Sequence, residues 1–188
     1  KCVPMIVVMP NGNFGKQAAA GETAENLAFR PVSTHLLPHY KDGLFELAFP
    51  EIVNYVDATF NTIPDKAHRA IAGLSMGGMH TLMITANYPE MFNYIGLYSA
   101  GVDFSHLNME EVPAYANLDA KLTKLAQGNP KLYWIACGNE DWLLPANKRL
   151  MERMDKDGLK YTFHESPRGH LWCNWRQYSL LFIPQLFK

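Results

Sequence analysis

The sequence predicts a single α/β domain over residues 1–188, with a mostly parallel sheet flanked by helices. Short apolar runs alternate with stretches of helical spacing along the chain, which is the pattern of strand–helix–strand units. A length of 188 residues suits one domain, and 48% hydrophobic residues are sufficient for one packed core. No repeat, low-complexity linker or change of composition divides the chain.

The first predicted element is a strand buried on both faces. Residues 5–9 form a continuous apolar run between Pro4 and Pro10, and Asn11-Gly12 follows as a turn signal. Residues 12–40 show no sustained period and are long for an unstructured loop. We interpret this stretch as either functional or mobile.

The remaining elements alternate along the chain. Pro50 is expected to break or kink the first helix, whereas Pro89 and Gly158 each end a later one. Helices are predicted at residues 44–60, 76–88, 118–127 and 146–157, and strands at residues 69–73, 94–99, 131–137 and 160–164.

Charge and cysteine content argue against several kinds of partner. Seventeen basic and 18 acidic residues leave a net charge of -1, which offers no global field for nucleic acid or an anionic membrane. No stretch approaches the ~20 apolar residues that a membrane span needs. Cys2, Cys137 and Cys173 are scattered and lack CxxC spacing, which argues against a metal site or a dense disulfide framework.

The strongest motif is Gly73-Leu-Ser75-Met-Gly77, which fits G-x-S-x-G between a predicted strand and a predicted helix. In this context the motif indicates a nucleophile elbow with Ser75 as the nucleophile. Small residues two positions before and two positions after Ser75 would avoid clashes in the sharp turn. The Met76 amide, at the start of the helix, would point at a developing oxyanion. The alternative is a glycine-rich turn with a helix-capping serine.

A serine nucleophile needs a histidine base, which in this kind of site follows the acid in the chain. His170 lies in a predicted loop after Pro167-Arg-Gly169, whereas His164 falls inside a predicted strand. His170 is therefore the better candidate for the base. The other five histidines either precede any suitable acid or, in the case of His80, lie within the predicted elbow helix.

The candidate acids follow predicted strands. Asp141, in Gly138-Asn-Glu-Asp141, comes directly after the strand at residues 131–137 and is the leading candidate. Glu140 is the reserve, and Asp103 ranks third because its place after a strand is less typical. A carboxylate that caps a turn or helix before Pro145 is the alternative reading.

With these residues in place, the chain resembles the esterase D-like hydrolases of carbohydrate esterase family 1, which have an α/β-hydrolase fold and include feruloyl esterases. Four motifs spread over the chain carry the resemblance: Val7-Val-Met-Pro-Asn-Gly12, Arg69-Ala-Ile-Ala-Gly-Leu-Ser-Met-Gly-Gly78, Gly138-Asn-Glu-Asp141 and Gly169-His-Leu-Trp-Cys-Asn-Trp-Arg176.

The resemblance implies an acyl-enzyme on Ser75, with His170 as base and then acid, Asp141 orienting it, and the Met76 amide in the oxyanion hole. It implies no metal or organic cofactor. It also suggests that Trp172 and Asn11 line the substrate cleft.

The substrates implied are feruloyl or acetyl esters of plant cell-wall polysaccharide. A fused or associated glycoside hydrolase and a secreted or periplasmic location would follow. The alternatives are an acyltransferase or another esterase D-like enzyme, acting on S-formylglutathione or siderophore esters, and a non-catalytic carbohydrate-binding module. Oligomeric state stays open.

One feature of the family is missing from this sequence. Similar proteins carry a His-Gly-x-Gly-like loop, which donates the second oxyanion amide, before the strand that matches residues 5–9. The strand leading into that loop normally lies between the one matching residues 5–9 and the one leading to Ser75. We therefore expect that the α/β-hydrolase domain lacks its amino-terminal strands, and that this chain is part of a longer hydrolase or that another segment or subunit fills the gap.

Overall fold

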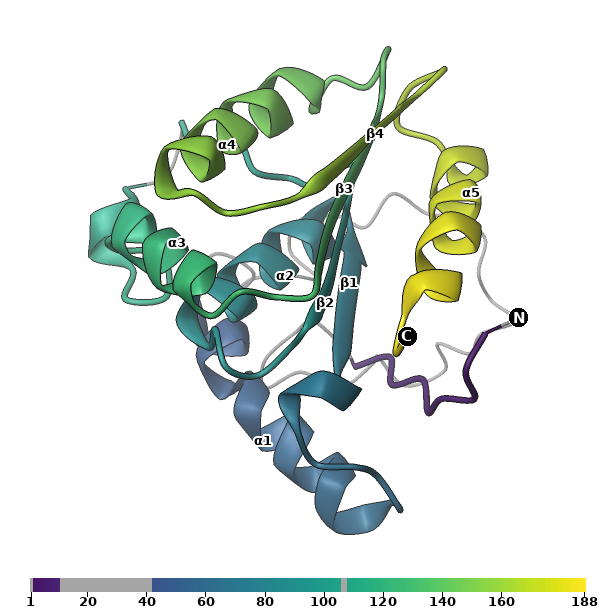
Figure 1. Cartoon of the computed structure of the whole chain (residues 1–188). Helices are drawn as coiled ribbons and strands as arrows, with labels where there is room; N and C mark the ends of the chain where they lie inside the picture. Colours follow the sequence, from purple (N-terminus) through teal and green to yellow (C-terminus); the bar gives the residue numbers. More distant parts are fainter. Residues whose placement is uncertain (1, 11–41, 106–107) are drawn as a thin grey trace, which may run out of the picture.

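The computed structural model describes residues 2–10, 42–105 and 108–188. Its centre is a four-stranded parallel sheet in the order β1-β2-β3-β4 (Figure 1). The strands are β1 (Ala70–Leu74), β2 (Tyr94–Tyr98), β3 (Leu132–Gly138) and β4 (Thr162–Ser166). The α-helices are α1 (Leu44–Thr59), α2 (Met76–Asn87), α3 (Leu118–Gln127), α4 (Leu144–Asp157) and α5 (Trp172–Phe182).

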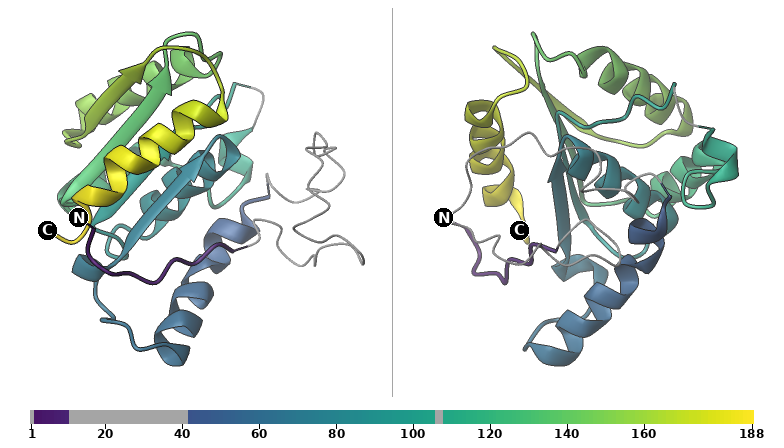
Figure 2. Two further views of the ribbon diagram at one scale, coloured as in Figure 1. Left: turned by 90° about the vertical axis from the view of Figure 1, so that its right-hand side faces the viewer. Right: turned by 180° about the vertical axis from the view of Figure 1, so that it is seen from behind.

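Helices cover both faces of this sheet. Helices α2, α3 and α4 lie on one face, and α5 lies on the other (Figures 1 and 2). Side chains of the central strands alternate between the two layers, so that Ile95 and Leu97 join the core under α2 to α4, whereas Tyr94 and Tyr98 join the core under α5. Burial on both faces explains why these strands are continuously apolar in sequence.

Most predicted elements are present, and several bounds moved by only a few residues. Residues 118–127 form α3 as predicted, and α1 continues through Pro50. Helix α5 and the short 3-10 helix Ile183–Gln185 were not predicted. Within the described residues, no helix is both long enough and apolar enough to span a bilayer.

The predicted strand at residues 5–9 is wrong. The described segment at residues 2–10 contains no strand and is mostly exposed; Val7 is 70% and Met9 is 88% exposed. Met5 alone in this segment packs against the core under α5. The apolar run satisfied the pattern of a buried strand, but a strand also needs a neighbour that pairs with its backbone. Among the described residues, β1 pairs with β2 only and forms the edge of the sheet.

A buried polar cluster joins α1 to the elbow helix α2. The Glu46 carboxylate is 1% exposed and accepts hydrogen bonds from His80 Nδ1 at 2.8 Å and from the Tyr115 hydroxyl at 3.2 Å. His80 is also buried, and its ring meets Phe45 edge-on at 5.0 Å between centroids. This cluster could not be predicted from the sequence, because its members come from three separate segments.

We expect Glu46→Ala to lower the free energy of unfolding by about 3–5 kcal/mol, because it removes the acceptor from two buried donors. Glu46→Gln should lower the free energy of unfolding clearly less, since its amide oxygen still accepts a hydrogen bond. Urea denaturation of both variants would measure the difference. Equal losses for the two variants would show that the charge, and not the acceptor, stabilises the cluster.

Candidate active site

The elbow at Ser75 has the strained backbone that the motif predicts. Ser75 lies between β1 and α2 with φ 53° and ψ -116°, a positive-φ conformation that costs free energy in a non-glycine residue. Two hydrogen bonds hold it there: its amide donates to the Tyr98 carbonyl at 2.9 Å, and its carbonyl accepts from the Gly101 amide at 2.7 Å. The neighbouring strand β2 and the loop after it therefore fix the nucleophile's backbone.

The two glycines of the motif differ in what they do. A Cβ on Gly73 would lie 2.1 Å from the Gly77 carbonyl oxygen, so a side chain there would collide with backbone. A Cβ on Gly77 would meet no described atom within 4 Å. Gly78, outside the motif, is also crowded, because its Cβ would lie 2.7 Å from the Ala100 Cβ.

We therefore expect Gly73→Ala to lower the free energy of unfolding by about 3 kcal/mol or more. Gly77→Ala, the matched control in the same motif, should change it by less than about 1 kcal/mol. Thermal or urea denaturation of the two variants would test this. A Gly73→Ala variant as stable as the parent would contradict the close approach across the elbow.

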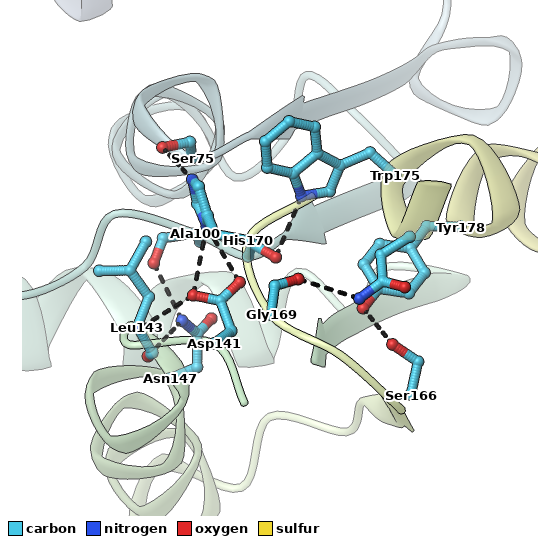
Figure 3. A network of polar contacts seen from close by, with 12 residues as sticks. Ser75, Ala100, Asp141, Leu143, Asn147, Ser166, Gly169, His170, Trp175 and Tyr178 are labelled. Carbon is cyan, nitrogen blue, oxygen red and sulfur yellow. Dashed lines mark hydrogen bonds and ion pairs between the residues drawn. The ribbon is translucent and has the colours of Figure 1, made fainter. Parts of the chain in front are cut away.

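The structure brings the three predicted catalytic residues together (Figure 3). His170 Nε2 lies 3.0 Å from Ser75 Oγ, and His170 Nδ1 lies 3.0 Å and 3.2 Å from the two carboxylate oxygens of Asp141. Since a carboxylate can only accept, Nδ1 carries the proton and Nε2 is free to accept the Ser75 hydroxyl proton. This is the arrangement of nucleophile, base and orienting acid.

All of these residues stand at the carboxyl edge of the sheet. Ser75 follows β1, Asp141 follows β3 and His170 follows β4. Because the carboxyl ends of parallel strands meet at one edge, residues far apart in sequence converge there. The position of the site is thus a consequence of the strand order.

Backbone and amide contacts hold Asp141 in place. Its side chain is fully buried, and Oδ1 accepts a hydrogen bond from the Leu143 amide at 2.9 Å. Asn147 of α4 donates through Nδ2 to the carbonyls of Leu143 and Ala100, both at 2.9 Å. Asn147 therefore ties the Asp141 turn to the loop beside Ser75, as Figure 3 shows.

A second set of contacts holds His170. Asn174 Nδ2 donates to the carbonyls of Pro167 and Gly169, both at 3.0 Å. The Trp175 indole meets the His170 ring edge-on at 4.8 Å between centroids, and its Nε1 donates to Ser99 Oγ at 3.1 Å. Both residues belong to α5, so the unpredicted helix supports the base.

The reserve candidates lie elsewhere. Glu140 is exposed, and it is Asp141 that contacts His170. Asp103 pairs at the surface with Arg149 at 3.9 Å between Oδ2 and Nη2. His164 lies within β4 and stacks on Trp134.

A family model described as "Putative esterase" matches residues 2–181 of this chain. The chain belongs to this esterase family.

Two relatives of this chain are named as esterases. A xylanase/feruloyl esterase of Xylanibacter ruminicola is 55% identical over 139 residues, which cover 73% of this chain and 17% of that protein. An acetyl esterase of Caldicellulosiruptor saccharolyticus is 27% identical over 157 residues, which cover 68% of this chain and 58% of that protein. The chain thus spans less than two thirds of either relative.

Solved structures agree on the fold. A CE1 ferulic acid esterase from Anaeromyces mucronatus has a TM-score of 0.62 and 20% identity, over 85% of this chain and 57% of that one. The enterobactin esterase of Shigella flexneri has a TM-score of 0.63 and 19% identity, over 83% of this chain and 42% of that one. These likenesses show that this chain has the α/β-hydrolase fold, of which the described residues form part.

The remaining predicted site residues have mixed outcomes. Met76 is the first residue of α2, so its amide lacks a carbonyl partner inside the helix and can serve an oxyanion. Trp172 is 48% exposed and meets Trp175 edge-on at 5.2 Å between centroids; its contact with substrate stays a prediction. Asn11 lies outside the described residues.

The cysteines of this chain take no part in the triad. Cys2, Cys137 and Cys173 are all free thiols. Cys137 is buried at the end of β3, where burial, followed by the negative charge of Asp141, raises the pKa of its thiol to about 12. The Cys137 thiol therefore stays neutral beneath the triad and is a poor nucleophile at physiological pH.

The sequence did not identify four residues that contact the triad or hold it in place: Trp142, Asn147, Asn174 and Trp175. Trp175 stood inside the motif after His170, and its aromatic side chain was a visible signal. Trp142 follows Asp141 directly and meets the His170 ring edge-on at 4.9 Å between centroids. Nothing in the sequence places either ring against His170, because these contacts arise only when the turns after β3 and β4 meet.

Proposed function

We propose that this chain is the catalytic part of a serine carboxylic ester hydrolase that removes feruloyl or acetyl groups from plant cell-wall polysaccharide. The observation that carries the proposal is the hydrogen-bonded line from Ser75 Oγ through His170 to Asp141. The 55% identity to a xylanase/feruloyl esterase favours feruloyl esters, and the more distant acetyl esterase leaves acetate as the second acyl group.

The reaction follows from the geometry. Ser75 Oγ attacks the ester carbonyl while its proton passes to His170 Nε2, and the carbonyl oxygen becomes an oxyanion near the Met76 amide. Collapse of this intermediate breaks the bond to the sugar oxygen, which takes the proton from His170. Water then attacks the acyl-enzyme by the same route, with His170 again as base, and releases the carboxylic acid.

The natural setting is part of the proposal. An insoluble polysaccharide cannot enter the cell, so the protein would act as a secreted or periplasmic enzyme. A glycoside hydrolase fused to it or acting beside it would expose further esters, as the name of the Xylanibacter ruminicola relative suggests.

Release of the two acids from arabinoxylan tests the proposal. The full-length protein is incubated with feruloylated and acetylated arabinoxylan, with Ser75→Ala as the control, and ferulate and acetate are quantified by chromatography. We expect ferulate release well above the control, with or without acetate release. If neither acid exceeds the control, the polysaccharide function is wrong.

A further inference from the structure

Trp142 is an exposed aromatic ring placed directly on the catalytic base. It lies in the turn between β3 and α4, next to Asp141, and is 64% exposed. Its ring meets the His170 imidazole at an interplanar angle of 82°. A large indole left in solvent at the rim of a catalytic triad is a surface that a ligand can cover.

A second tryptophan contacts the same imidazole but has little surface to offer. Trp175 is 8% exposed, and its indole N–H is already bonded to Ser99. Trp172 is exposed, but its ring contact is with Trp175. Of the two tryptophans that contact His170, Trp142 is therefore the one with an open surface.

The reaction mechanism of the triad indicates which half of a bound ester lies next to Trp142. When the tetrahedral intermediate collapses, His170 Nε2 gives its proton to the oxygen of the departing alcohol. That oxygen must then lie within hydrogen-bond reach of His170. A side chain packed on His170 and open to solvent therefore adjoins the alcohol half of the ester more closely than the oxyanion, which lies by Met76 of α2.

We propose that Trp142 is a specificity-determining residue that packs against the sugar serving as the leaving group, an inference that rests on the proposed function. One face of a sugar ring presents C–H bonds, which suit the negatively polarised face of an indole. Trp142 thereby selects esters of carbohydrates over esters of small alcohols. It contributes to the first half of the reaction only, because the sugar leaves before the acyl-enzyme is hydrolysed.

Two substrates with the same acyl group and different alcohols distinguish an effect on the alcohol half of the ester from an effect on the acyl half. Methyl ferulate and a feruloylated arabinose oligosaccharide form the same acyl-enzyme but release different alcohols. We expect Trp142→Ala in the full-length protein to lower kcat/KM for the oligosaccharide about tenfold more than kcat/KM for methyl ferulate. Trp142→Phe should retain most of the activity on the oligosaccharide, because an aromatic face remains.

Controls make the outcomes distinct. Tyr55→Ala removes an aromatic ring on α1 that is 65% exposed, and should leave kcat/KM unchanged for both substrates. Circular dichroism checks the fold of every variant. Equal loss on both substrates, or no loss on either, would overturn the role of Trp142. A wild-type protein that hydrolyses neither substrate would overturn the proposed function itself, together with this inference.

Discussion

Ser75→Ala is expected to lower kcat on a feruloyl ester by about 10⁶-fold. The hydroxyl is the atom that forms the acyl-enzyme, and no other nucleophile lies at 3.0 Å from His170 Nε2 among the described residues. Binding and the oxyanion hole would still leave a residual rate about 10³–10⁴ above the reaction in water. Steady-state kinetics with methyl ferulate at high enzyme concentration would measure the loss.

A matched serine variant controls for this measurement. Ser179 lies on α5, where its hydroxyl donates to the Trp175 carbonyl at 3.0 Å. Ser179→Ala should keep kcat within about twofold, because that hydroxyl bonds to a backbone carbonyl of its own helix and not to a residue of the triad. A Ser75→Ala variant that keeps more than about one hundredth of the parent activity would mean that Ser75 is not the nucleophile.

Asp141→Asn is expected to lower kcat by about 10⁴-fold while the fold is retained. Two contacts, from His170 Nδ1 and the Leu143 amide, require an acceptor at this position. An asparagine amide directed at His170 would instead donate to Nδ1 and shift the ring proton to Nε2. The imidazole would then face Ser75 with a donor, and could no longer accept the hydroxyl proton.

Glu140→Gln is the control for Asp141→Asn. It makes the same chemical change one residue earlier, on a side chain that is exposed. We expect it to leave kcat within about twofold of the parent, measured on the same substrate and at the same pH. A loss at Glu140 equal to that at Asp141 would show that the acid has been assigned to the wrong residue.

The triad could be predicted because each member has a local signature. The glycine spacing around Ser75, the acidic turn after an apolar run and the histidine in a Pro-Gly loop are visible in sequence, and their order restricts the choice. The choice between Asp141 and Glu140 was less secure, since both follow β3. The geometry favours Asp141, because Asp141 is buried against His170 whereas Glu140 is exposed to solvent.

The errors in the predicted fold have two physical causes. The run at residues 5–9 has the apolar pattern of a strand, but strand formation depends on a neighbour that the local sequence does not reveal. Helix α5 was not predicted because its local sequence does not favour a helix. Its tryptophans, tyrosine and phenylalanine are weak helix formers. The helix is stabilised instead by packing against the sheet, where the Phe182 ring lies so close to Gly96 that a Cβ added to Gly96 would be 3.1 Å from it.

A fluorophosphonate probe tests whether His170 activates Ser75 as a nucleophile. Attack by Ser75 Oγ forms an oxygen–phosphorus bond, expels fluoride and leaves the hydroxyl proton on His170. Peptide mass spectrometry of the labelled full-length protein should place the phosphonate on Ser75, with labelling abolished in Ser75→Ala and strongly slowed in His170→Ala. Absence of labelling, or labelling undiminished in Ser75→Ala, would contradict the account.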